Sequence, residues 1–238
     1  MDEKTMKNWT VTYQEYKPEE EKLREALCTT GNGYFATRGS VDGTRADEVH
    51  YPGTYLAGGY NRLETNIAGK VIVNEDLVNW PDWTVLKFKD DTGEWFDPDK
   101  VKILGYRQDL DLYEGVLRRE ILFEDGRGRR TNLLSRRFVS MRDPHRAGIE
   151  WTLTPKNWSG SVIVHSAIDG SVINSGVPRY RDLNSRHLEV LEADTFGEHS
   201  ICLKVRTTQS ELIMTQLAST RVYVDSLDFS VKRESISE

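Results

Sequence analysis

The sequence predicts an all-β protein, a large antiparallel β-sandwich with few short helices. Three observations support this fold class: polar and apolar residues alternate through the second half of the chain, turn signals separate the alternating runs, and helical periodicity is scarce. Successive side chains of a strand point to opposite faces, so a period of two gives one buried face and one solvated face. Half-buried strands of this kind belong to antiparallel sheets.

The individual elements follow from local composition. Pro18 and the acids after it predict the first turn of a helix, because proline and carboxylates suit a helix N-terminus. The expected strands are residues 117–123, 133–141, 149–153, 161–168, 201–206, 222–224 and 229–231. Turn signals occur at residues 91–93, 124–128, 157–160 and 196–198. Residues 183–192 fit a strand or a helix equally well.

Length and charge limit the function classes. A chain of 238 residues without repeats or a linker predicts one undivided domain, residues 1–238. The net charge of -6 argues against a nucleic-acid partner, which needs a basic surface. The chain has no apolar run of membrane-span length and no apolar signal core near its start. With only two distant cysteines, Cys28 and Cys202, we expect reduced thiols and a cytoplasmic location.

Two neighbouring segments suggest carbohydrate contact. Residues 31–62 are rich in glycine and tyrosine, and residues 73–83 combine acids, amides and tryptophans. Aromatic faces cover the apolar side of a pyranose, and polar groups bond its hydroxyls. We therefore predict a carbohydrate-facing surface, with weak affinity, formed by Tyr60, Arg62, Trp80 and Trp83. For Arg38, a structural ion pair with Glu25 or another acid is favoured over a ligand contact.

No residue emerges as catalytic. Glu75 and Asp76 are adjacent, so in a strand they point apart and form no obvious acid/base pair. The charges of residues 110–120 and the arginines 127, 129, 130, 136 and 137 are expected to be ordinary strand-face charges. The sequence has no metal-ligand spacing, phosphate-binding loop or dinucleotide fingerprint, so we predict neither a metal nor a cofactor.

The order of several segments resembles the N-terminal domain of glycoside hydrolase family 65, which contains maltose, trehalose and kojibiose phosphorylases. The matching parts are Trp9 and residues 16–19, 31–40, 52–62, 74–83, 109–119, 136–146 and 155–160. The resemblance implies a β-supersandwich related to the galactose mutarotase-like fold. In that family the N-terminal domain is followed by a helical linker, an (α/α)6 catalytic barrel and a small C-terminal β-domain. The catalytic general acid of the family is a glutamate in the barrel.

The resemblance implies a noncatalytic domain that supports the barrel and the rim of its pocket, with residues 51–63 and 74–83 as loops reaching that rim. The chain to Glu238 leaves no room for a barrel, so no family catalytic residue is carried over. Inorganic phosphate would be a co-substrate of a parent phosphorylase. The barrel is the expected partner, and the sequence leaves open whether the protein also forms a homodimer. The alternatives are a free-standing carbohydrate-binding module and, third, a mutarotase-like isomerase with a His and Glu pair.

Overall fold

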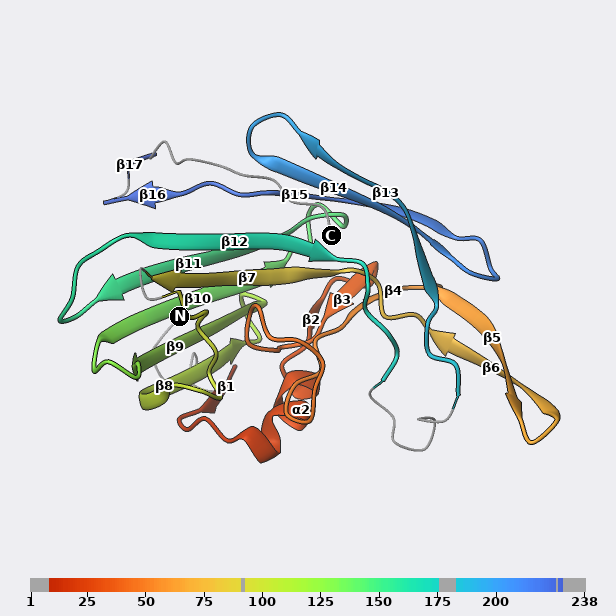
Figure 1. Cartoon of the computed structure of the whole chain (residues 1–238), viewed down its shortest axis with the longest axis horizontal. Helices are drawn as coiled ribbons and strands as arrows, with labels where there is room; N and C mark the ends of the chain where they lie inside the picture. The colour runs from red at the N-terminus through yellow and green to blue at the C-terminus, as the bar shows by residue number, and fades with distance from the viewer. Residues whose placement is uncertain (1–8, 91–92, 176–182, 226, 229–238) are drawn as a thin grey trace. The chain divides into compact units, whose positions relative to one another are not determined.

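The computed structural model describes residues 9–90, 93–175, 183–225, 227 and 228. The all-β prediction is confirmed: within this part of the chain one helix accompanies many antiparallel strands (Figure 1). The elements are β1 (Thr10–Tyr13), α2 (Pro18–Leu27), β2 (Thr30–Gly31), β3 (Phe35–Thr37), β4 (Thr54–Leu56), β5 (Tyr60–Ile67), β6 (Lys70–Leu77), β7 (Asp82–Asp90), β8 (Lys102–Asp111), β9 (Val116–Glu124), β10 (Arg130–Val139), β11 (Ala147–Pro155), β12 (Val162–Asp169), β13 (Leu188–Phe196), β14 (Ser200–Thr207), β15 (Ile213–Ser219), β16 (Tyr223–Val224) and β17 (Leu227–Asp228).

Contacts group these elements into two compact units. The first unit comprises residues 1–57 and 86–165, and the second comprises residues 58–85 and 166–238. Strands β7 and β12 pair with each other, and each passes from one unit into the other. The expectation of one undivided domain stays a prediction.

The first unit is built on a five-stranded antiparallel sheet in the order β1-β8-β9-β10-β11. Its middle strands alternate strictly, so that residues 131, 133, 135, 137 and 139 of β10 are buried and the residues between them face outward. The inward face packs into a cluster of buried residues: Val41, Phe88, Tyr106, Ile121, Phe123 and Leu133. Burying apolar area of this kind is the main source of stability for such a sheet.

Helix α2 and the small sheet β2-β3-β4 complete the first unit. The helix begins at Pro18 with three glutamates in its first turn, which confirms the sequence prediction. After the helix, the chain passes close to the helix C-terminus, where Gly39 lies against Cys28. A Cβ added to Gly39 would lie 2.6 Å from the Cβ of Cys28, so the residue after Arg38 must be glycine.

The described residues of the second unit form, besides parts of β7 and β12, three separate strand groups. A hairpin pairs β5 with β6, a three-stranded sheet has the order β13-β14-β15, and β16 pairs with β17. The segment 183–192, left open between strand and helix, enters strand β13 at Leu188. Strands also form at the other expected places, except that residues 229–231 lie outside the described residues.

The expectation of loops at residues 51–63 and 74–83 was wrong, because strands β4 to β7 occupy most of both segments. The missed signal is the turn between β5 and β6. It places Ala68 and Gly69 at positive φ, 51° and 80°, and alanine is seldom found there. Without a recognisable turn, the β-branched run Val71, Ile72 and Val73 was not read as half of a hairpin.

Candidate functional site

Two of the four residues predicted to contact carbohydrate lie side by side on β5. Tyr60 and Arg62 are two residues apart, so they share one face of the strand, and both are exposed. The Arg62 Nε lies 2.8 Å from Glu75 Oε2 on β6, and this pair is open to solvent. Exposed ion pairs contribute little stability, so Arg62 and Glu75 remain available for other hydrogen bonds.

The two tryptophans have different positions. Trp80 is buried, with 1% of its surface exposed, and so presents no ring face to solvent. Trp83 is half-buried on β7. Tyr60, 47% exposed, is therefore the aromatic residue of the four that offers the most open surface.

Between Tyr60 and Arg62 the chain is fixed by Asn61, which is buried. Asn61 Oδ1 accepts hydrogen bonds from the backbone amides of Gln209 at 3.0 Å and Ser210 at 2.9 Å. Its Nδ2 therefore faces Thr208 Oγ1 at 3.1 Å and His187 Nδ1 at 3.2 Å. One side chain thus ties the base of the β5–β6 hairpin to the turn between β14 and β15.

The same geometry fixes the tautomer of His187. Because Nδ1 accepts from Asn61, the ring proton lies on Nε2, which is 3.3 Å from Asp76 Oδ2. Burial lowers the pKa of His187, and the charge and hydrogen bond of Asp76 only partly offset this effect. The imidazole is consequently neutral at neutral pH, and Asp76 also accepts a hydrogen bond from Asn74.

The adjacent acids Glu75 and Asp76 point to opposite faces of β6. Glu75 pairs with Arg62 in solvent, whereas Asp76 faces the buried His187. This confirms the expectation that they do not converge. The two carboxyl groups cannot lie on either side of one glycosidic bond as an acid/base pair must.

In the first unit, Arg38 has the structural role that its sequence context indicated. Its Nη2 lies 4.0 Å from Glu25 Oε2 and donates to the carbonyl of Lys22 at 2.9 Å. The guanidinium also lies 5.1 Å from the ring centroid of Tyr51. Glu25 is completely buried and binds the Tyr51 amide through Oε2.

Glu25 also belongs to a buried polar cluster around His50. The Nδ1 of His50 lies 2.9 Å from Glu25 Oε1, and its Nε2 lies 3.1 Å from Tyr16 Oη and 3.3 Å from Asp99 Oδ2. Burial lowers the pKa of His50, but the hydrogen bond and charge of Glu25, with the charges of Asp99 and Asp47, outweigh it and raise the pKa overall. The His50 ring therefore joins α2 to the segment that carries Asp99.

Sequence reasoning missed two buried arginines. Arg119 donates to the carbonyls of Gly39 at 2.8 Å and Ser40 at 3.2 Å. Arg137 donates to the carbonyl of Arg38 at 2.7 Å and to Asp42 Oδ1 at 2.8 Å. A signal was present: Arg118-Arg119 and Arg136-Arg137 are adjacent pairs, and a strand turns one member of each pair inward.

Asp42 completes this arrangement. Besides Arg137, it accepts hydrogen bonds from the Trp151 Nε1 at 2.9 Å and from the Ser135 hydroxyl. Arg130 and Arg136 behave as predicted, with exposed pairs to Glu124 and Glu150. Arg129 does not, because it lies in the turn before β10 and pairs, largely buried, with Asp125 and Asp90. Residues 38–42 of the glycine-rich segment are thus held against β9 and β10 by buried hydrogen bonds and by the Arg137–Asp42 ion pair.

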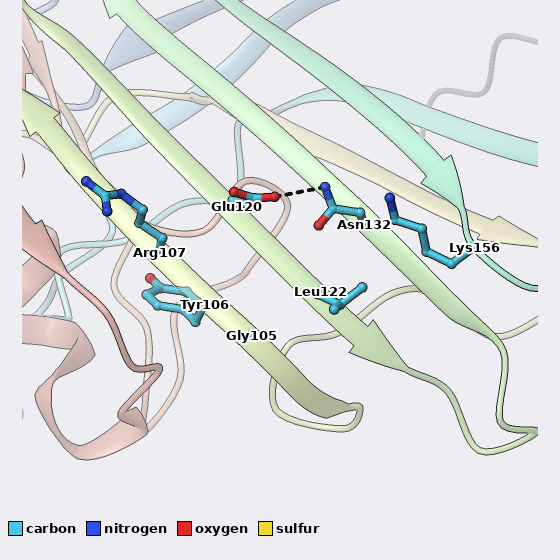
Figure 2. Close-up of a pocket in the computed structure, with 7 residues that line it drawn as sticks. All are labelled: Gly105, Tyr106, Arg107, Glu120, Leu122, Asn132 and Lys156. Carbon is cyan, nitrogen blue, oxygen red and sulfur yellow. Dashed lines mark hydrogen bonds between the residues drawn. The ribbon is translucent and has the colours of Figure 1, made fainter.

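The outward face of the same sheet carries shallow hollows. Figure 2 shows one of about 340 Å³, where Arg107, Glu120 and Asn132 come from β8, β9 and β10, and Lys156 follows β11. Asn132 Nδ2 donates to Glu120 Oε1 at 3.1 Å. The aromatic residue of the hollow, Tyr106, is buried, so no exposed ring is available for a sugar to stack on.

The described residues contain no group of three or more His, Cys, Asp or Glu side chains placed to hold a metal ion. Helix α2, with ten residues, is too short and polar to cross a membrane, and the described part of the chain holds no longer helix.

Comparison with known proteins identifies the family. Residues 11–237 match the family model described as glycosyl hydrolase family 65, N-terminal domain. The chain belongs to this family. A solved structure from the human microbiome, provisionally assigned as a kojibiose phosphorylase, shares the fold with a TM-score of 0.79 at 20% identity, over 93% of this chain and 28% of that chain.

Family 65 relatives are similar along nearly the whole chain. An uncharacterized glycosyl hydrolase of Mycobacterium tuberculosis is 42% identical over 217 residues, which are 91% of this chain and 16% of that protein. A kojibiose phosphorylase of Caldanaerobacter subterraneus subsp. tengcongensis is 32% identical over 230 residues, 96% of this chain and 28% of that protein. A trehalose 6-phosphate phosphorylase of Lactococcus lactis is 30% identical over 213 residues, 87% of this chain and 26% of that protein. The chain thus spans 16% to 28% of these relatives' length.

Proposed function

We propose that this family 65 N-terminal domain is a noncatalytic part of an enzyme acting on α-linked glucose disaccharides, where it supports the catalytic barrel and the rim of its pocket. One observation carries the proposal. The domain match extends over residues 11–237, yet the same residues account for only 16% to 28% of the relatives. The parent enzyme would use inorganic phosphate if it is a phosphorylase, as several relatives are by name.

The side-chain contacts support a scaffolding role. Glu25, Asp42 and Asp76 are engaged with His50, Arg137 and His187 in buried or half-buried pairs. Such pairs fix geometry and are costly to break, so these three carboxylates are not free to transfer a proton to a substrate. The rim contribution is proposed for Tyr60 and Arg62, because Asn61 holds their strand rigidly while both side chains stay exposed.

The isomerase alternative is disfavoured by burial. It requires a histidine and a carboxylate that converge on an open site. The pairs His50–Glu25 and His187–Asp76 have the right chemistry, but the histidines are only 2% and 1% exposed. A sugar cannot reach either ring without displacing the surrounding structure.

Activity assays test the noncatalytic role. The purified chain should release neither glucose nor glucose 1-phosphate from kojibiose, trehalose or maltose, with or without phosphate. Sustained release that is lost in Glu75→Gln or Asp76→Asn would overturn the proposal. The gene offers an independent check, because the reading frame after codon 238 should encode a helical barrel that contains a glutamate as the catalytic general acid.

A further inference from the structure

The β5–β6 hairpin has an unprotected edge. It forms a two-stranded sheet, so in the part of the chain that the structure describes β6 has a ladder partner on one side alone (Figure 1). Edge strands of soluble proteins are usually blunted by charges, prolines or bulges. In β6 the run Val71 to Asn74 contains none of these, and its register with β5 is regular.

The end of the hairpin is also exposed on both faces. Val71 and Val73 point to one side and are 61% and 59% exposed, while Ile72 points to the other side and is 41% exposed. The base differs, since Asn61 and Leu63 are buried there. A two-stranded hairpin with so little cover is marginally stable in water, and additional strands stabilise it.

We propose that β6 pairs antiparallel with β6 of a second copy of this chain, around a two-fold axis at Ile72. The two hairpins would then form one continuous four-stranded sheet in the order β5-β6-β6-β5. This inference does not depend on the proposed function, because it uses the hairpin alone.

Backbone geometry permits this register. In a hairpin with a two-residue turn, the pair that closes the turn is hydrogen-bonded, and the pairs alternate from there. The closing pair is Ile67 with Lys70. This alternation directs the N–H and C=O groups of Val71 and Val73 to the free edge. With the axis at Ile72, Val71 of one copy bonds Val73 of the other.

Side-chain chemistry selects this register among its neighbours. It places Ile72 opposite Ile72, and Val71 opposite Val73, so that four valines meet on one face. Lys70 lies opposite Asn74, and no like charges face each other across the pairing. A shift of the axis to Val73 would instead set Val71 against Glu75. The second copy is preferred to an unrelated strand because the edge is complementary to itself in this way.

Variants that introduce a charge at Ile72 test the pairing of β6 with β6 of the second copy. The wild-type chain should show a concentration-dependent monomer–dimer equilibrium in sedimentation velocity. Ile72→Lys and Ile72→Glu each place two like charges on the axis and should be monomeric, with at least a tenfold weaker dimer. An equimolar mixture should regain a dimer, because lysine then faces glutamate. A wild-type chain that is monomeric up to about 1 mM, or a dimer that both variants leave unchanged, would refute the pairing.

Engineered cysteines test the register, in a Cys202→Ser background. With oxidised glutathione as the oxidant, Ile72→Cys should give a disulfide-linked dimer, because directly opposite residues lie within the Cα separation that a disulfide spans. Val73→Cys is the matched control and should link far less, since residue 73 faces residue 71. Linking through Val73→Cys in place of Ile72→Cys would overturn the register. Circular dichroism of each variant confirms that the strands are retained.

Discussion

At the scale of single residues, stability in the first unit depends on which member of an adjacent pair faces inward. Arg136 and Arg137 are neighbours on β10, yet Arg136 pairs with Glu150 in solvent and Arg137 pairs with Asp42 in the interior. The Arg137 side chain is only 1% exposed, compared with 62% for Arg136. Loss of the ion pair should therefore change the free energy of unfolding far more at Arg137 than at Arg136.

We expect Arg137→Met to lower the free energy of unfolding by about 3–5 kcal/mol, because it leaves the Asp42 carboxylate buried without its cation. Arg136→Met is the matched control and should change stability by about 0–1 kcal/mol. Urea denaturation of both variants measures the difference. Equal costs for the two substitutions would show that the interior pair does not stabilise the fold.

The pH dependence of stability should report on His50. Its folded-state pKa is raised above the ordinary value of 6.5, so the folded state binds the proton more tightly than the unfolded state. The resulting stabilisation is fully present below 6.5 and is lost as pH rises through the raised pKa. Urea midpoints between about pH 6 and about pH 9 should therefore fall with pH, and His50→Gln should flatten the slope. An unchanged slope in the variant would assign the effect to another group.

At the scale of elements, the hairpin depends on the contacts at its base, among which Asn61 makes the most hydrogen bonds. The tip of β5–β6 is exposed, while its base is bound to the turn after β14 through Asn61. Strand pairing alone does not stabilise two strands, so these contacts decide whether the hairpin stays in place. Tyr60 and Arg62, the residues proposed for the rim, lie directly beside Asn61.

Asn61→Ala should release the hairpin base before the rest of the second unit unfolds. The backbone amides of Gln209 and Ser210 would lose their acceptor, and because these groups are only partly buried the cost should be at most about 1–3 kcal/mol for each. Hydrogen exchange should accelerate at residues 60–77 and 207–212. Asn66→Ala, near the tip, is the control and should change stability by less than about 1 kcal/mol. Uniform acceleration over both units would contradict a local anchor.

At the scale of the whole molecule, the four residues predicted to contact carbohydrate do not line one pocket in the described structure. Tyr60 and Arg62 are exposed on one strand face, Trp80 is buried, and the hollows of the five-stranded sheet are shallow and charged. Few hydrogen bonds and one exposed ring leave little affinity after the entropy of association is subtracted. This balance fits a domain that contributes to a rim rather than a complete binding site.

Titration with glucose, maltose or trehalose, followed by NMR, should therefore give a Kd of about 1 mM or weaker. Any shifts should lie around Tyr60 and Arg62 and should disappear in Tyr60→Ala. Saturable micromolar binding at this surface would instead support a free-standing carbohydrate-binding module.

The sequence by itself determined the fold class, the start of α2, the strands β9 to β12, β14 and β16, a structural role for Arg38 and the family, because alternation, capping residues and motif order are local properties of a chain. Only the tertiary structure showed that Trp80 is buried, that Arg119 and Arg137 clamp the glycine-rich segment, and that β5 and β6 form a hairpin. Burial of a given side chain depends on what packs against it from distant parts of the chain. Residue type and spacing do not contain that information, so composition suggested a tryptophan surface where packing produced a core.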